Sequence, residues 1–192
     1  MSNKVKLNIK KINKEPKIGL VNGLYATTSG LGGITVIQAK KLISEKKFGL
    51  EKLTGSQGDV MKESMDCAFT LAANLLNNKD RERYENKDTK FGAHIHCPEA
   101  ATPKDGPSAG LAITTCLFSL LTKIPIRNDV AMTGEVDLDG NARQIGGLYS
   151  KIQGAMNAGV KLVLIPRANE KDLDLIFRKE EEEKNNIKKS IS

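Results

Sequence analysis

A run of eleven residues without a charge, 111–121, constrains the fold of this chain more than any other feature. The run is mostly apolar and long enough for about three helical turns. Lys123 and Pro125 follow it and favour the end of a helix. A helix that is apolar on nearly all sides has to be buried. We therefore expect the rest of the chain to pack around this helix, with the loop 103–110 leading into it.

The loop 103–110 places a serine at the expected start of the helix. Asp105 suits the N-cap and Pro107 the first helical position, so Ser108 falls in the first turn. Free backbone N–H groups and the helix dipole favour negative charge there. Ser108 is therefore a candidate nucleophile for attack on a carbonyl, with N–H groups between Gly106 and Ser108 holding the oxyanion. The alternative is a serine that only caps or turns the chain.

A nucleophilic serine needs a base, and two histidines are candidates. His94 and His96 lie in segment 91–98, whose pattern predicts a strand, so their side chains share one face. Imidazole is the group most often used to deprotonate serine near neutral pH. Cys97 belongs to the opposite face, which disfavours a zinc site built from these three residues.

Lys151 is the second candidate base. It falls in a predicted helix that follows Gly147 and ends at Gly159. Leu148 lies three residues before it and Ala155 four residues after it, so Lys151 belongs to the apolar stripe of this helix. Burial lowers the pKa of a lysine, which allows the neutral amine to act as a base. The alternative is a lysine that packs its stem and keeps its amine in water.

Several motifs resemble, in the same order, those of the proteolytic domain of Lon proteases. The resemblance covers roughly residues 19–177. It rests on segments 21–24, 55–64, 98–99, 101–110, 132–135, 145–148 and 164–166, together with Lys151.

The resemblance implies a role for three side chains. Ser108 falls on the family's nucleophile, Lys151 on its base and Thr133 on the residue that orients the lysine. The resemblance thus favours Lys151 over the two histidines. By their position beside Ser108, we expect Asp105, Gly106 and Pro107 to support the site, with Asp105 shaping the loop and not taking part in the chemistry.

For the whole chain, the resemblance implies an α+β fold with mixed β-sheets packed against helices. The implied function is a serine endopeptidase that cleaves unfolded or misfolded proteins and forms a hexameric ring. ATP dependence would come from a separate or fused AAA+ ATPase, because the sequence has no GxxxxGK[ST] phosphate loop. No cofactor or metal is expected in this chain. The alternatives are a non-catalytic Lon-like scaffold or nucleic-acid-associated domain, and a hydrolase that pairs Ser108 with His94 or His96.

Composition and charge suggest three parts: a flexible basic segment 1–16, a domain 17–179 and a charged, disordered tail 180–192. The net charge is +7, but aromatic residues make up only 4% and Trp is absent, so nucleic acid is not an expected partner. The odd number of cysteines, 3, indicates reduced thiols. With no signal peptide and no membrane-length apolar run, we expect an intracellular, cytoplasmic protein.

Apolar periodicity and turn residues predict the remaining elements. We expect a hairpin of strands 18–27 and 34–39, then a strand at 47–54 and a helix from Asp59 to about Asn77. The charged segment 78–90 is expected to be an exposed loop. A strand at 129–138 would carry Thr133 toward Lys151, followed by a strand at 161–166 and a helix at 170–177.

Overall fold

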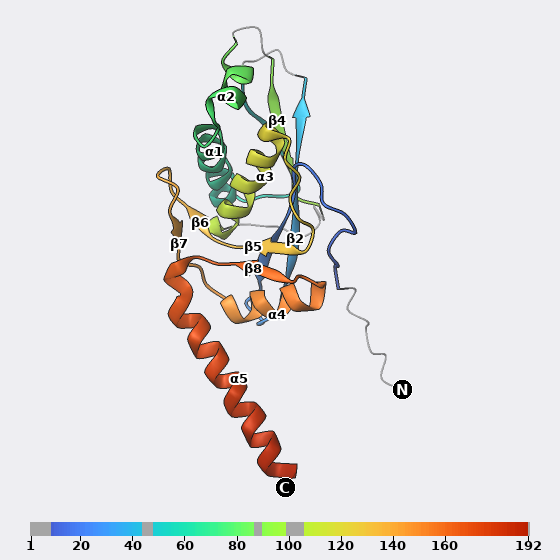
Figure 1. Ribbon diagram of the computed structural model, residues 1–192, viewed down its shortest axis with the longest axis vertical. Coiled ribbons are helices and arrows are strands. Elements are labelled where there is room, and N and C mark those ends of the chain that lie inside the picture. Colours follow the sequence, from blue (N-terminus) through green and yellow to red (C-terminus); the bar gives the residue numbers. More distant parts are fainter. Residues whose placement is uncertain (1–8, 44–47, 87–89, 99–105, 192) are drawn as a thin grey trace.

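The computed structural model describes residues 9–43, 48–86, 90–98 and 106–191. Figure 1 shows helices packed around a central sheet and a long C-terminal helix that extends away from the body. The main sheet has the strand order β3-β4-β2-β1-β5-β8, and β6 and β7 form a separate pair. The strands are β1 Leu20–Ala26, β2 Gly32–Leu42, β3 Gly49–Thr54, β4 Gly92–His96, β5 Val130–Met132, β6 Glu135–Val136, β7 Ala142–Arg143 and β8 Leu162–Leu164. The helices are α1 Asp59–Asn74, α2 Asn78–Glu85, α3 Gly110–Thr122, α4 Leu148–Ala158 and α5 Glu170–Ile191, with 3-10 turns η1 Pro107–Ala109 and η2 Arg167–Asn169.

The main sheet combines antiparallel and parallel pairs. β1 and β2 form the predicted hairpin, with Leu20 opposite Gln38 and Ala26 opposite Gly32. β4 is antiparallel to β2 and parallel to β3, whereas β5 is parallel to both β1 and β8. This mixed sheet with its helices confirms the predicted α+β class.

Helices cover both faces of β2, so its side chains are buried on alternate sides. Ile37 and Ala39 belong to the core that α1 and α3 close. Ile34 and Val36 point to the opposite face, where they pack with Ala155 of α4. α3 and α4 therefore lie on opposite faces of the hairpin.

α3 is the buried helix that the uncharged run predicts. Ile113, Leu117 and Leu121 are fully buried in it, together with Cys116. The helix differs from the prediction at its start, because the turn η1 precedes it and α3 itself begins at Gly110. The predicted burial of the run is confirmed.

The charged segment after α1 is not the exposed loop that we expected. Residues 78–85 form α2, whose N-cap residue Asn77 accepts a hydrogen bond from Asp80 N–H at 2.9 Å. Tyr84 on this helix donates a hydrogen bond to the Leu121 carbonyl at 2.7 Å, and its ring packs against Phe48. A capping residue and one aromatic anchor thus stabilise a helix in a sequence with little apolar content. Residues 87–89 of the predicted loop lie outside the described residues.

Both ends of the chain contain more structure than predicted. Residues 1–8 lie outside the described residues, but Ile12 N–H donates to the Ala158 carbonyl at 3.1 Å and its side chain packs under α4. At the other end, α5 continues through 180–191, the range for which a charged tail was predicted. Glu and Lys are good helix formers, which favours this continuation. None of the described helices, α5 included, has the length and apolar character needed to cross a membrane.

Candidate active site

Ser108 lies in η1, the 3-10 turn that connects Gly106 to α3. Gly106 has a φ of 107°, a conformation that favours glycine, and Pro107 begins the turn. The Ser108 carbonyl accepts a hydrogen bond from Gly134 N–H at 2.8 Å, which ties the turn to the segment after β5. The predicted N-cap residue, Asp105, lies outside the described residues.

Lys151 lies in the first turns of α4 with only 4% of its surface exposed. Its Nζ atom is 3.2 Å from Ser108 Oγ and 3.1 Å from Thr133 Oγ1. Burial lowers the pKa of Lys151, because the ammonium form loses its hydration. The neutral amine, which can accept a proton, is therefore more populated here than in an exposed lysine.

Thr133 is fully buried between β5 and β6, whereas one continuous strand was predicted for 129–138. The strand breaks because Gly134 N–H turns away to bond the Ser108 carbonyl. The Thr133 hydroxyl donates to the same carbonyl at 3.2 Å, so Oγ1 remains free to accept an N–H from Lys151. Ser108 Oγ, 3.2 Å from the same Nζ, is the second polar atom that the amine contacts.

The position of Lys151 depends on close packing between α4 and β2. A Cβ on Gly154 would lie 2.6 Å from the Gly32 carbonyl oxygen, and a Cβ on Gly32 would meet the Ser150 carbonyl. Ser150 Oγ also donates to the Gly30 carbonyl at 2.9 Å. Glycine at these positions lets α4 lie directly on the start of β2, which brings Lys151 into the site. We did not predict this role from the sequence, although a glycine inside a predicted helix is a signal of close packing.

Ser108 and Lys151 line a cleft of about 800 Å³. Most of its wall comes from three segments: 24–28 at the end of β1, 106–109 around the serine and 144–147 before α4. The volume is in the range of sites that bind sizeable ligands. A serine hydroxyl and a buried amine thus meet at the side of a groove large enough for a segment of peptide.

The two histidines lie elsewhere. His94 Nε2 and His96 Nδ1 both contact Thr54 Oγ1, at 2.8 and 2.7 Å. Burial lowers the pKa of His94, and the neighbouring charge of Lys52 lowers it further. Neither histidine lines the cleft that contains Ser108. The structure therefore brings Lys151, and not a histidine, to the serine hydroxyl.

Known proteins are similar in sequence to this chain over most of its length. The sequence pattern of the Lon protease (S16) C-terminal proteolytic domain matches residues 2–189. The chain belongs to this family. A Lon protease homolog of Acanthamoeba polyphaga mimivirus is 44% identical over 180 residues, covering 92% of this chain and 17% of its own length. The Lon protease of Acinetobacter baumannii is 47% identical over 161 residues, covering 83% of this chain and 19% of its own length.

The Lon relatives are much longer than the region they share with this chain. A third relative, the Lon protease of Helicobacter pylori, is 44% identical over 182 residues, which is 86% of this chain but 21% of that protein. The chain thus spans about a fifth of the length of the relatives it matches. The Lon resemblance predicted from the motifs is confirmed by these matches.

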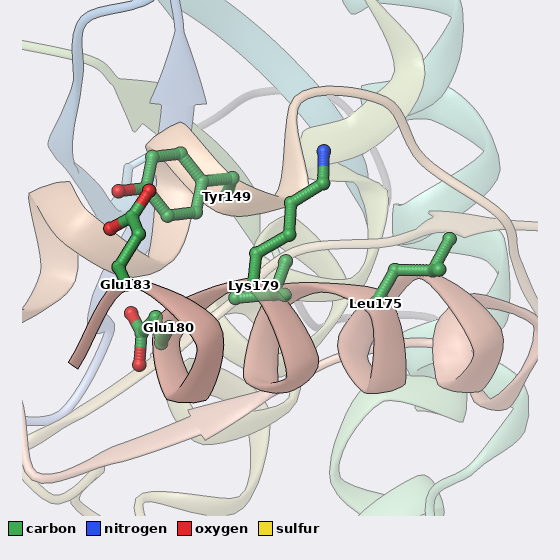
Figure 2. Close-up of a pocket in the computed structure, with 6 residues that line it drawn as sticks. Tyr149, Leu175, Lys179, Glu180 and Glu183 are labelled. Atoms are coloured by element: carbon green, nitrogen blue, oxygen red, sulfur yellow. The ribbon is translucent and has the colours of Figure 1, made fainter. Parts of the chain in front are cut away.

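A second cavity, of about 350 Å³, lies between α4 and α5. Gln153 Nε2 of α4 donates to Glu180 Oε1 of α5 at 3.4 Å, so the two helices stay in contact beyond the first turns of α5. None of the residues around this cavity lines the cleft at Ser108. Figure 2 shows the side chains that surround it and labels five of them, Tyr149, Leu175, Lys179, Glu180 and Glu183.

Proposed function

We propose that this chain is a serine endopeptidase domain that cleaves unfolded or misfolded proteins with Ser108 as nucleophile and Lys151 as base. One observation carries the proposal: the buried Lys151 Nζ lies 3.2 Å from Ser108 Oγ, within reach for proton transfer. The membership in the Lon proteolytic family supports the same assignment.

In the first step, neutral Lys151 accepts the Ser108 proton as Oγ attacks the scissile carbonyl carbon. Backbone N–H groups around Ser108 bind the tetrahedral oxyanion. Pro107 does not contribute, because proline has no backbone N–H. The Lys151 ammonium then gives its proton to the departing amine, which leaves an ester on Ser108. A water molecule, deprotonated by the same lysine, releases the acid product and restores the hydroxyl. Thr133 holds the amine throughout by accepting one of its N–H bonds.

Variants at four positions test the assignment. Ser108→Ala and Lys151→Ala should each lower the hydrolysis of unfolded casein by about a thousandfold or more. His94→Gln and His96→Gln should leave the rate within about twofold, because both rings bond Thr54 outside the cleft. If the histidine variants lose activity while Lys151→Ala keeps it, a histidine is the base and the proposal is wrong. A chain that cleaves nothing, with or without these changes, would favour a non-catalytic scaffold.

We also propose that an ATP-driven module prepares folded substrates for this site and that the domain works in a hexameric ring. The greater length of the Lon relatives supports the first part, since the shared region is about a fifth of each. The chain alone should therefore cleave casein but spare a stably folded protein. Light scattering should give the mass of six chains; a monomer at all concentrations would contradict the ring.

A further inference from the structure

Asn169, the last residue of η2, is fully buried and makes a paired contact with the backbone of Ile145. Its Oδ1 accepts the Ile145 N–H at 3.1 Å, and its Nδ2 donates to the Ile145 carbonyl at 2.8 Å. A single side chain thus satisfies both backbone groups of one residue, as a neighbouring strand would. This contact fixes the backbone of Ile145 against the start of α5.

A carboxylate at the start of α5 strengthens the contact. Asp172 Oδ2 accepts a hydrogen bond from Asn169 Nδ2 at 2.7 Å and another from Gln144 Nε2 at 3.2 Å. Both N–H bonds and the oxygen of the Asn169 amide are therefore used, which fixes its orientation. Two consecutive residues, Gln144 and Ile145, are held from the same point.

The segment held in this way lines the cleft. Residues 144–147 all contribute to its wall, far from the serine loop in sequence but beside Ser108 in space. Lys151 follows in α4, but α4 has its own anchor, because Gly154 packs directly on β2 and Ala155 lies in the core. Releasing Asn169 should therefore loosen the wall without moving the lysine.

We propose that Asn169 is a positioning residue for the substrate, which holds segment 144–147 as a wall of the cleft. It sets the affinity for the bound peptide and leaves the reactivity of Ser108 unchanged. This inference rests on the proposed function, in which the cleft receives an unfolded polypeptide. It assigns a binding role to a residue that touches neither the serine nor the lysine.

The variant Asn169→Asp tests the proposal with almost no change in side-chain size. The new carboxylate can still accept the Ile145 N–H but cannot donate to the Ile145 carbonyl, and it meets Asp172 at close range. In a Ser108→Ala background, the Kd for a fluorescently labelled casein peptide should rise about tenfold. In the active chain, KM should rise while kcat changes by less than about twofold.

A chemical probe separates this role from a general loss of structure. A small fluorophosphonate reacts with Ser108 without needing the cleft wall, so its rate should stay within about twofold in Asn169→Asp. Asn157→Asp is the matched control, since it adds the same charge on an exposed part of α4 and should leave Kd unchanged. If Asn169→Asp does not fold, the double variant Asn169→Asp/Asp172→Asn serves in its place. It removes the repulsion between the two carboxylates, and the only remaining defect is the missing hydrogen bond to the Ile145 carbonyl.

Two results would overturn the proposal. One is an unchanged Kd in both Asn169 variants, and the other is a fluorophosphonate rate that falls in parallel with peptide binding. The catalytic proposal fails separately: if Ser108 of the unmodified chain does not react while Asn169→Asp still weakens peptide binding, the positioning role stands and the serine assignment does not.

Discussion

Replacing Gly154 by alanine should push α4 away from β2 and destabilise the fold, although helix propensity alone predicts that the change stabilises it. In the middle of a helix, Gly→Ala usually stabilises by about 1 kcal/mol. Here, however, the new methyl group would lie 2.6 Å from the Gly32 carbonyl oxygen and closer still to the Gly33 nitrogen. These are backbone atoms, which cannot rotate away as a side chain does.

The geometry gives the size of the effect. An ordinary contact of a Cβ begins at 3.4 Å, whereas the Gly33 nitrogen would lie 2.2 Å away, so α4 and β2 have to separate by about 1 Å or slightly more. Overpacking of this kind costs about 1–3 kcal/mol. Because the neighbouring atoms belong to the rigid backbone, we expect a cost at the upper end of this range, which exceeds the gain in helix propensity. For a chain of this size, we expect Tm to fall by about 4 °C or more. A displacement of about 1 Å at Lys151 should lower kcat about a hundredfold.

Calorimetry and casein hydrolysis together check this prediction. Gly146→Ala is the control for stability, because a Cβ there meets nothing within 4 Å, and Tm should change by less than about 1 °C. If Gly154→Ala raises Tm and keeps full activity, the close approach of α4 to β2 does not position the lysine. The dependence of the site on this packing would then be refuted.

Substitutions at three positions, Thr133, Lys151 and Tyr84, have defined outcomes. Thr133→Val should lower kcat about tenfold to a hundredfold by leaving the Lys151 amine without its acceptor, and Thr133→Ser should restore it. Lys151→Met should raise Tm, and the rise should be larger at low pH than at high pH. Burial lowers the pKa of Lys151 in the folded state, so the cost of burying its charge is fully present at low pH. This cost is relieved as the pH rises through the lowered pKa, because the lysine then becomes neutral. Tyr84→Phe should cost about 1 kcal/mol in urea unfolding by removing the bond to the Leu121 carbonyl, with casein hydrolysis unchanged.

The parts of the fold that follow from local pattern could be predicted from the sequence. The apolar run 111–121 forms a buried helix, and the β1–β2 hairpin appears where alternation and glycines indicate it. The stripe that contains Leu148 and Ala155 is enough to predict that Lys151 lies on the inner face of its helix, where it is indeed buried. Each of these features is determined by residues that lie close to one another in the sequence.

The features that could not be predicted depend on contacts across the chain. The strand predicted for 129–138 breaks at Thr133, because the next N–H, that of Gly134, donates to the Ser108 carbonyl. Ser108 lies 25 residues before Thr133 in the chain. The role of Asn169 rests on Ile145, and the roles of Gly32 and Gly154 rest on each other. A glycine inside a predicted helix signals close packing, but no local pattern names the segment on which it packs.

α2 is a different case, because its signal was present in the sequence. Asn77 followed by Asp80 is a recognisable helix start, and the side chain does cap the Asp80 N–H. We expected a loop because the segment is highly charged and nearly without apolar residues. The anchor that offsets this composition, the Tyr84 ring against Phe48, becomes visible only when the chain is folded.

The pH dependence of Ser108 modification tests most directly whether Lys151 activates the serine. The rate of reaction with a small fluorophosphonate would be measured from about pH 6 to about pH 10 in the unmodified chain and in Lys151→Ala. Because burial lowers the pKa of Lys151, the rate should rise through one ionisation below the ordinary lysine value of about 10.4. This rise should disappear in Lys151→Ala. A profile that Lys151→Ala leaves unchanged would show that another group activates the serine, and the Ser108–Lys151 pairing would be wrong.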